Sequence, residues 1–436
     1  MQQTQSVLPT VVRYTGAEVA LHQFDDLPCD YVTTPQARLD LDHKQRSSLL
    51  PWRGQFSPEL VALLIEQYSR PDSVLLDPFA GSGTTLFEAA RKNLACYGVE
   101  INPAAVEMAR TAHFVTVDKA DRAAAIKRTE RLIETHIQPA QPDLFSYQSA
   151  PASAAVSSTQ AIDAQLEPLL AQAADPLVHN ILANTIMRYL DSPTRNGDQF
   201  LRAFREHAGL ITALPYSGQA CTVFHNDART IPLATGSVDL VITSPPYINV
   251  FNYHQNNRPA MERMGWDLLA IAKSEIGSNR KNRQNRFLTV VQYALDMTAA
   301  LGEMRRLLRP TGRAIVVVGR ESNVRGVPFR NGRLVAALAV AGAGFRLASR
   351  QERKFQNKFG SVIYEDILHL FPVAARCPNA DAVACVVARA VLAEAAGQKD
   401  ETVQHEIQDA WERAGSVPPS PLLSLPACAK QASAAP

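Results

Sequence analysis

The sequence predicts an α/β protein whose mostly parallel, doubly wound sheet carries a helical insertion and ends in an antiparallel strand pair. Three observations support this fold class. Short apolar segments alternate with helix-like segments in a β–α–β–α order after residue 70. That order stops at residue 118 and resumes near residue 220. Two strand-like segments, 345–353 and 362–371, follow each other at the end of the pattern.

The elements before residue 137 follow from helix caps and apolar periodicity. A helix is expected over 55–68, because Ser57 suits an N-cap, Pro58 suits the first helical position and leucines recur at helical spacing. Apolar strands and helices then alternate, and a charged helix-prone segment follows. In order, we expect strand 73–79, helix 84–93, strand 95–100, helix 103–113 and helix 118–134.

The later elements include two segments of biased composition. Residues 138–160 are rich in Pro, Ser and Ala, which predicts an exposed linker, and 161–207 return to helical composition with a break near Pro193. The tail from Ser416 is again rich in Pro, Ser and Ala and is predicted to be disordered. Between them we expect strands 220–226 and 238–243, a polar basic stretch over 249–286, helix 287–308, strand 313–318, helix 334–340 and the final strand pair.

Composition limits the class of protein. The 436 residues allow two or three domains, or one large domain with insertions. With 44 Lys and Arg against 42 Asp and Glu, the net charge of +2 disfavours a protein that binds nucleic acid over its whole surface. No apolar run approaches the roughly 20 residues of a membrane helix. Six scattered cysteines without a CxxC pair disfavour a zinc ribbon. We therefore expect a soluble cytoplasmic protein with no metal site and no membrane partner.

The segment DPFAGSGTT, residues 77–85, is the strongest local signal. A strand runs into a glycine-rich turn and then into a helix. Gly81 and Gly83 allow the backbone to approach a ligand closely, and the N–H groups at the helix start can bind a polar or anionic group. Taken alone, such a turn is also consistent with a tight structural loop.

A carboxylate at the end of the next strand strengthens the ligand interpretation. Glu100 follows Gly83 by 17 residues. In a Rossmann-like sheet this position presents a carboxylate to ribose hydroxyl groups. The turn lacks both the GxGxxG spacing of dinucleotide sites and the GK[ST] of triphosphate sites. A nucleoside cofactor without phosphates fits better, and S-adenosylmethionine is the obvious one.

The segment TSPPY, residues 243–247, directly follows an apolar strand. Its two prolines remove two donors and hold the backbone extended. The carbonyl groups of Ser244 and Pro245 can then point into a cleft at the carboxyl edge of the sheet. Tyr247 offers a flat face on which a base can stack. A stiff strand exit is the structural alternative, and the glycine loop upstream argues against it.

Together, DPFAGSGTT and TSPPY resemble the amino-methyltransferases of DNA, which methylate adenine N6 or cytosine N4. The resemblance covers about residues 50–117 and 216–372, which would form the two parts of a Rossmann-like catalytic domain that uses S-adenosylmethionine. It leaves out an N-terminal arm over 1–49, a helical insertion over 118–215 that could take part in target recognition, and a C-terminal extension over 373–436 that is expected to be partly disordered.

The resemblance also implies roles for single residues. Residues 77–84 match the cofactor loop, Glu100 matches the acid that holds the ribose, and Asp227 matches the polar residue near the adenine amino group. The segment around Phe56 resembles, more loosely, the element that closes over the methionine end. The implied cofactor residues are Phe56, Ser57, Asp77, Phe79, Ala80, Gly81, Gly83, Thr84, Glu100, Ile101, Asp227 and Ala228, and the implied catalytic residues are Ser244, Pro245, Pro246 and Tyr247.

The implied mechanism requires no catalytic cysteine. Hydrogen bonds accepted from an exocyclic amino group by Ser244 and the Pro245 carbonyl favour a tetrahedral nitrogen with an available lone pair, and the flipped base would stack on Tyr247. Ser before PPY is typical of the cytosine-N4 enzymes, whereas Asp or Asn is typical of the adenine-N6 enzymes. We therefore expect a site-specific cytosine-N4 DNA methyltransferase. Adenine-N6 methylation, RNA or protein methylation and a non-catalytic subunit remain as alternatives.

Basic residues gather shortly after TSPPY. Four of them lie within Arg280–Arg286, interleaved with Asn and Gln, which suits phosphate contacts and hydrogen bonds to base edges. A solvated charge run is the ordinary alternative. The expected partner is double-stranded DNA, and the resemblance leaves open a cognate restriction endonuclease. The candidate DNA-binding residues are Asn249, Tyr253, Arg258, Lys273, Arg280, Lys281, Arg283 and Arg286.

Overall fold

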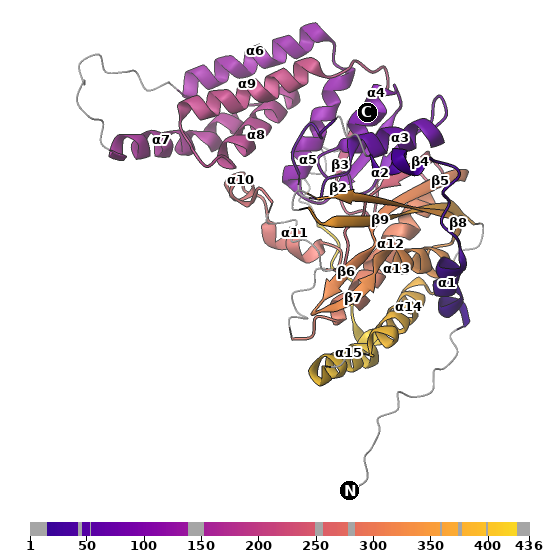
Figure 1. Ribbon diagram of the computed structural model, residues 1–436. Coiled ribbons are helices and arrows are strands. Elements are labelled where there is room, and N and C mark those ends of the chain that lie inside the picture. The colour runs from indigo at the N-terminus through magenta and orange to yellow at the C-terminus, as the bar shows by residue number, and fades with distance from the viewer. Residues whose placement is uncertain are drawn as a thin grey trace, which may run out of the picture.

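A seven-stranded sheet forms the centre of the computed structural model, which describes residues 15–41, 46–52, 54–137, 152–248, 256–277, 284–357, 360–373, 377–397 and 400–424 (Figure 1). The strand order is β3-β2-β1-β4-β5-β9-β8; the first five strands are parallel, and β9 is antiparallel to both of its neighbours. The predicted fold class is therefore confirmed. The strands are β1 (Leu75–Asp77), β2 (Cys96–Glu100), β3 (Cys221–His225), β4 (Val238–Thr243), β5 (Leu308–Gly319), β8 (Phe345–Gln356) and β9 (Val362–Pro372).

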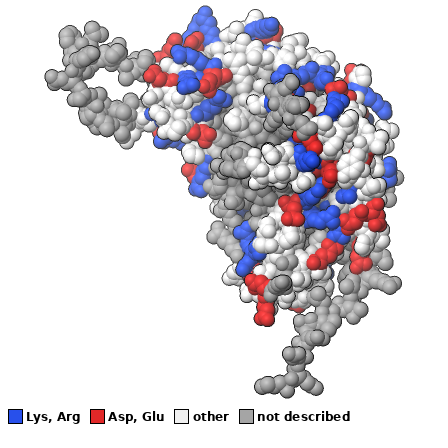
Figure 2. Space-filling view, in the orientation of Figure 1, with Lys and Arg blue, Asp and Glu red and all other residues white. Residues whose placement is uncertain are grey.

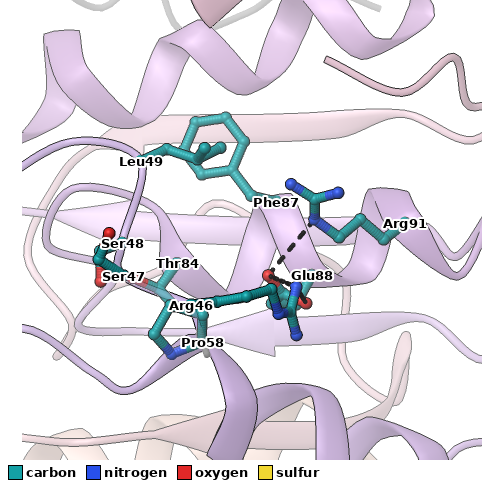
Figure 3. A pocket seen from close by; sticks show the side chains of 9 residues that line it. All are labelled: Arg46, Ser47, Ser48, Leu49, Pro58, Thr84, Phe87, Glu88 and Arg91. Atoms are coloured by element: carbon teal, nitrogen blue, oxygen red, sulfur yellow. Dashed lines mark hydrogen bonds and ion pairs between the residues drawn. The ribbon is translucent and has the colours of Figure 1, made fainter. Parts of the chain in front are cut away.

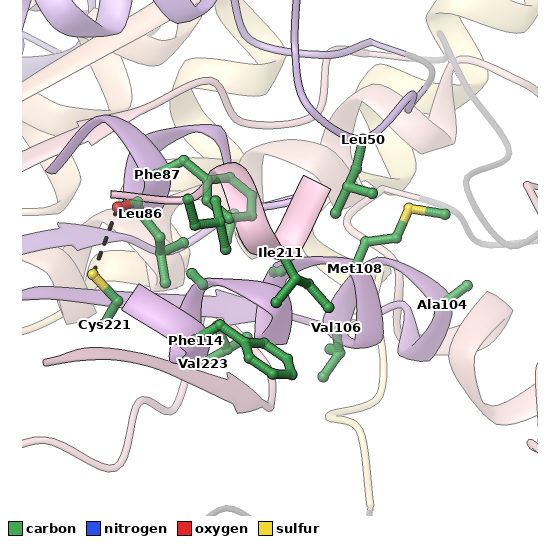
Figure 4. Close-up of a cluster of buried hydrophobic side chains, with 14 of the residues drawn as sticks. Leu50, Leu86, Phe87, Ala104, Val106, Met108, Phe114, Ile211, Cys221 and Val223 are labelled. Atoms are coloured by element: carbon green, nitrogen blue, oxygen red, sulfur yellow. Dashed lines mark hydrogen bonds between the residues drawn. The ribbon is translucent and has the colours of Figure 1, made fainter. Parts of the chain in front are cut away.

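Both faces of the sheet are covered, so its central strands are apolar throughout instead of alternating with polar residues. Leu75 and Ile242 belong to a hydrophobic cluster on one face, and their neighbours Leu76 and Val241 belong to the cluster on the other. Figure 4 shows part of the first cluster, where Phe87 lies among other buried side chains of the same face. The continuous apolar segments of the sequence thus mark strands buried from two sides.

Helices form the two outer layers (Figure 1). Pro58 and Pro103 each stand at the first position of a helix, and Asn102 caps the second of these by accepting hydrogen bonds from the backbone of Ala104 and Ala105. The first face carries α3 (Pro58–Tyr68), α4 (Thr84–Arg91) and α5 (Pro103–Arg110), and the second carries α12 (Leu288–Leu307), α13 (Asn331–Ala337) and α14 (Ala380–Ala395).

The expected helical insertion is a group of four helices that projects from one end of the sheet (Figure 1). Residues 152–160, for which composition predicts a linker, are helical; the reason is that the alanines of this stretch are strong helix formers and that Ile162 and Leu166 anchor the same helix in the core. Residues 138–151 lie outside the described residues. The four helices are α6 (Lys119–His136), α7 (Ala152–Ala171), α8 (Pro176–Leu190) and α9 (Gly197–Ala213).

Two buried contacts fasten this insertion to the sheet domain. The guanidinium of Arg122 donates to the carbonyls of Val117, Leu214 and Pro215, which lie at the beginning and the end of the insertion. In addition, Asn180 and Asn184 of α8 donate to the backbone carbonyl of Glu107 in α5, at 2.7 and 2.9 Å. The insertion is therefore packed along α5 as well as joined at its ends.

Several further elements were not predicted. The N-terminal arm contains two helices, the polar basic stretch contains two short ones, and a small hairpin follows β5. Past β9, α14 and a last helix pack on the second face of the sheet. The unpredicted elements are α1 (Thr15–Asp26), α2 (Gln36–Asp40), α10 (Arg258–Arg263), α11 (Leu268–Ser274), β6 (Glu321–Val324), β7 (Val327–Arg330), α14 and α15 (Glu401–Arg413).

Candidate functional site

The glycine-rich loop joins the carboxyl end of β1 to α4 and is organised around one buried carboxylate. Asp77 is 2% exposed and accepts hydrogen bonds from the Phe79 N–H (3.1 Å), the Thr85 hydroxyl (2.6 Å) and the Thr243 hydroxyl (2.6 Å). Burial raises the pKa of this carboxyl, and the two hydroxyl groups oppose the shift. Because Thr243 immediately precedes Ser244, Asp77 ties the glycine loop to the TSPPY segment.

The two glycines of the loop are required by its backbone. Gly81 and Gly83 have φ values of +51° and +91°, which side chains rarely tolerate. A Cβ atom on Gly83 would lie 2.9 Å from the Cα of Ala109, and one on Gly81 would lie 3.3 Å from Cδ1 of Trp52. Ala80 and Thr84 are buried beside them, whereas Phe79 is partly exposed. The glycine-rich loop therefore lies close to the segment that contains Trp52.

Glu100 lies at the carboxyl end of β2, next to this loop. Its carboxylate accepts hydrogen bonds from the Gly81 N–H (2.9 Å) and the Asn102 N–H (2.8 Å), and part of the side chain remains exposed. Burial raises the pKa of Glu100 to about 7, against the effect of these two backbone donors. The following residue, Ile101, is fixed through its carbonyl, which accepts a hydrogen bond from Nε2 of His225 at 3.1 Å. The site thus presents an acceptor to a hydroxyl-bearing ligand at the sheet edge.

The segment before α3 covers the loop from the other side. Gln55 donates to the Ser82 hydroxyl, which in turn donates to the Leu50 carbonyl. Ser57 is the N-cap residue by position, but its side chain makes no capping bond, and its buried Oγ has no hydrogen-bond partner among the described residues. Phe56 packs against the first core cluster. An unpaired hydroxyl beside the loop suits the polar methionine end of a cofactor.

A cavity of about 210 Å³ lies between residues 46–49, the start of α3 and the outer side of α4 (Figure 3). Its one carboxylate is already paired with both of its arginines. Glu88 is paired with Arg46 at 3.1 Å and with Arg91 at 3.5 Å. We regard this cavity as a structural junction that holds the N-terminal arm on α4.

The TSPPY segment leaves β4 next to β1 and is held at several points. Pro245 is buried, and the Pro246 carbonyl accepts a hydrogen bond from the Tyr293 hydroxyl at 2.9 Å. The Ser244 and Tyr247 hydroxyl oxygens lie 3.3 Å apart. The Tyr247 ring packs on Gly319, where a Cβ atom would come within 2.8 Å of the ring. These contacts bring together four predicted catalytic residues and fix the tyrosine in place.

Asp227 lies just past β3 in an ion-paired cluster. It is 2% exposed and accepts hydrogen bonds from three nitrogen atoms of Arg229 and, at 3.3 Å, from the Leu423 N–H of the C-terminal segment. Ala228 is buried beside it. The predicted contact of Asp227 with an adenine amino group stays a prediction, because these four donors already occupy the acceptor positions of a carboxylate.

The candidate DNA-binding residues are only partly described. Arg258, Lys273 and Arg286 are exposed, and Arg258 donates to Glu262 of its own helix at 2.7 Å. Figure 2 shows basic and acidic side chains interleaved over one face of the molecule, with no region of one sign alone. The roles of these residues stay predictions. Asn249, Tyr253, Arg280, Lys281 and Arg283 lie outside the described residues.

Sequence reasoning missed the residues that support the site from behind. Thr85 and Thr243 lie within the two motifs. Their hydroxyl groups could therefore have been predicted from the sequence as hydrogen-bond donors within the site. Tyr293 in α12 and Glu365 in β9 carry no local signal, since their roles arise only from the packing of distant elements. In the described part of the chain, no three His, Cys, Asp or Glu side chains are placed to hold a metal ion together.

The loop and the arm before it match a known family. Residues 38–111 match the family model of N6/N4 DNA methylases, described as DNA methylase. The segment around the cofactor loop is therefore similar to DNA methylases. The Type II methyltransferase M.MjaII of Methanocaldococcus jannaschii is 31% identical over 67 residues, which is 14% of this chain and 13% of that relative. The chain thus spans about an eighth of the length of this relative, and the family-model match covers the cofactor half of the predicted site.

Solved structures also match this chain, at low similarity. A SAM-dependent methyltransferase from Methanosarcina mazei is 12% identical, with a TM-score of 0.31, and the match covers 72% of this chain and 98% of that one. A TehB-like SAM-dependent methyltransferase from Corynebacterium glutamicum is 11% identical, with a TM-score of 0.28, covering 72% and 86%. The fold assignment accordingly depends on the strand order of this chain itself.

S-adenosylmethionine is the cofactor of this family, and the residues of the loop fit it. The partly exposed Glu100 carboxylate can accept from ribose hydroxyl groups, the Ser57 hydroxyl has no partner among the described residues, and the two positive-φ glycines add no side chain to the loop. Among the described helices, none is long and apolar enough to cross a membrane.

Proposed function

We propose that this chain transfers a methyl group from S-adenosylmethionine to an exocyclic amino group of a base in double-stranded DNA, with cytosine N4 as the target. The observation that supports the proposal best is the hydrogen bonding of Asp77, which joins the cofactor loop and the TSPPY segment at adjacent strand ends. A donor loop and an acceptor segment held at one sheet edge are what a transfer between two ligands requires.

Each ligand would be held by its own set of residues. Glu100 would accept from the ribose, and Ser57 and Phe56 would contact the methionine end. When bound, S-adenosylmethionine supplies a methyl group activated by a positive sulfonium. Ser244 and the Pro245 carbonyl would accept hydrogen bonds from the amino group of the target, and Tyr247 would stack on the extrahelical base. Catalysis then consists of positioning and of making the nitrogen lone pair available.

The choice of cytosine N4 rests on Ser244. Ser in this place is typical of the cytosine-N4 group, and adenine N6 is the second candidate because both bases present an amino group. RNA or protein methylation and a non-catalytic subunit are less favoured: the Gly81, Gly83, Glu100 and TSPPY set is intact, and the matching family is that of DNA methylases.

Sequence preference would come from surfaces around the site. Lys273 and Arg286 flank the basic loop and are exposed, and the insertion extends from the same body (Figure 1). We propose that this loop contacts DNA phosphates and that the insertion contributes to target recognition. A cytoplasmic location, and a restriction endonuclease that cuts the same site, would both agree with this function.

The direct test is a transfer assay with labelled S-adenosylmethionine and plasmid DNA, followed by hydrolysis and identification of the modified base. We expect N4-methylcytosine. N6-methyladenine alone would replace the cytosine assignment, and labelling of RNA but not DNA would refute the substrate class.

Replacing Ser244 with alanine should reduce kcat about 100-fold, because it removes one acceptor from the reacting nitrogen. Cofactor binding, measured by calorimetry, should remain, since Glu100 and the glycine loop are unchanged. Ser237→Ala is the matched control, because that hydroxyl bonds only the Ala234 carbonyl in an exposed turn. If Ser244→Ala lost cofactor binding as well, Ser244 would not have the role proposed here.

Cofactor affinity should rise with pH across neutrality. The pKa of Glu100 is about 7, and only the ionised carboxylate accepts from both ribose hydroxyls. Between pH 6 and pH 8 the ionised fraction, and with it the affinity for S-adenosylhomocysteine, should therefore increase about tenfold. In Glu100→Gln the affinity should be low and independent of pH. An affinity that fell with rising pH in the unmodified protein would contradict this assignment.

A further inference from the structure

A carboxylate from the antiparallel strand β9 reaches the back of the TSPPY segment. Glu365 is the register partner of Gly319, the residue on which the Tyr247 ring packs. Its carboxyl group lies within hydrogen-bonding reach of Tyr247. Only 16% of its side chain is exposed. Nothing in the TSPPY motif itself points to this residue, which lies on the far side of β5.

A buried cation, Arg353, lies beside Glu365 and stabilises its charged form. Nε of Arg353, on the neighbouring strand β8, lies 3.1 Å from Glu365 Oε2, and the Arg353 side chain is 6% exposed. Burial raises the pKa of Glu365, while Arg353 and the Tyr247 hydroxyl both oppose that shift because they stabilise the charged form. In its charged form, which Arg353 stabilises, Glu365 can only accept a hydrogen bond.

The direction of the hydrogen bonds in the site follows from this charge. An ionised carboxylate can only accept a hydrogen bond, so Tyr247 donates its single hydroxyl proton to Glu365. The Tyr247 oxygen can then only accept from Ser244, 3.3 Å away. With its proton turned toward Tyr247, the Ser244 hydroxyl keeps its lone pairs for a donor on the other side.

We infer that Glu365 is a positioning residue that sets the direction of the chain Glu365–Tyr247–Ser244 and thereby makes the site select an amino group over a carbonyl group. This inference deepens the proposed function and rests on it for the identity of the ligand. Cytosine and adenine present an amino donor at the position where uracil and hypoxanthine present a carbonyl acceptor. A Ser244 oxygen that can only accept favours the first pair, because the second would leave two acceptors facing each other.

Oligonucleotide binding tests the selection without any need for turnover. The probes are fluorescein-labelled pentanucleotides of deoxycytidine and deoxyuridine, and of deoxyadenosine and deoxyinosine, each measured by anisotropy with saturating S-adenosylhomocysteine. Within each pair the phosphate charge is the same, so the ratio of affinities reports the edge of the base. The unmodified protein should prefer the amino-bearing member of at least one pair about tenfold.

Glu365→Gln should reduce that preference to the part that the Pro245 carbonyl supplies, because the amide can donate to Tyr247 and so reverse the direction of the hydrogen bonds. Tyr247→Phe interrupts the same chain without disturbing Arg353 and should reduce the preference to the same extent, which keeps the test valid should Glu365→Gln fold poorly. Glu352→Gln is the matched control: this carboxylate lies on β8 and bonds Tyr31 and Arg320. It should leave the preference unchanged.

The outcomes separate this inference from the function on which it rests. If Glu365→Gln and Tyr247→Phe keep the tenfold preference, or if the unmodified protein shows none, Glu365 does not set the direction of the chain. If the preference depends on Glu365 but the protein methylates no nucleic acid, the inference about the chain is supported and the proposed function is wrong.

Discussion

Replacing Asp77 with alanine is expected to lower the free energy of unfolding by about 4 kcal/mol. The change leaves the Phe79 N–H and the hydroxyls of Thr85 and Thr243 without their acceptor in a site that excludes water. Each unsatisfied buried donor costs about 1–3 kcal/mol. Urea unfolding followed by circular dichroism measures the loss directly.

Asp77→Asn separates the hydrogen bonds of this residue from its charge. The amide can still accept from Phe79 and Thr243, and it removes a charge whose burial is unfavourable, as the raised pKa of Asp77 indicates. We therefore expect a loss of only about 1 kcal/mol. Methyl transfer should fall in Asp77→Ala, since Ser244 would lose its fixed neighbour. Equal instability of the two variants would show that the charge, and not the hydrogen bonding, organises the loop.

Arg229→Met is expected to be the second strongly destabilising change, with a loss of about 4 kcal/mol. The guanidinium lies between Asp227 and Asp296 at 2.6 and 2.9 Å, and the three side chains are 3% exposed or less. Removing the cation leaves two buried carboxylates without compensation. Arg229 also donates to the carbonyls of Ser420 and Pro421, so the C-terminal segment should detach.

Two measurements distinguish the loss of stability from the detachment of the C-terminal segment. Denaturant unfolding gives the stability, and limited proteolysis reports whether the segment after Val417 has become accessible. The combined variant Arg229→Met, Asp227→Asn, Asp296→Asn should recover much of the stability, because no charge is left buried, but the segment should remain accessible. A single variant that unfolds normally and resists the protease would exclude this cluster as the anchor of the C-terminal segment.

The sequence was sufficient to predict those elements whose structure depends on local chemistry. The turn after β1 can be predicted from the sequence because Gly81 and Gly83 occupy positive-φ positions. The position of Glu100 follows from the strand that it ends. The parallel strands are readable because they are buried on both faces and are therefore apolar throughout. These elements required no knowledge of contacts between distant residues.

The features that could not be predicted depend on contacts between residues that are distant in the sequence. Glu365 and Tyr293 reach the TSPPY segment only after β9 and α12 are in place, and Arg353 reaches Glu365 only after β8 has paired with β9. The proline-rich stretch after Ser416 is typical of disorder in composition, yet residues 417–424 are described and packed. Proline lacks the N–H donor but keeps its carbonyl, and it is through carbonyls that this stretch binds Arg229 and, at Pro418, Gln292. The helix α15 could have been predicted, because Val403, Ile407 and Ala410 form an apolar stripe at helical spacing.

If the insertion contributes to target recognition as proposed, its attachment at two places has a consequence for how specificity changes over evolution. An appendage joined only at its ends could be exchanged between proteins by recombination at two points. Here Asn180 and Asn184 are buried against the Glu107 carbonyl of α5, so a transplanted insertion would leave that carbonyl and its own amides unsatisfied unless α5 came with it. The heritable unit is therefore the insertion together with α5, and α5 begins just after the Glu100 that we assign to the cofactor.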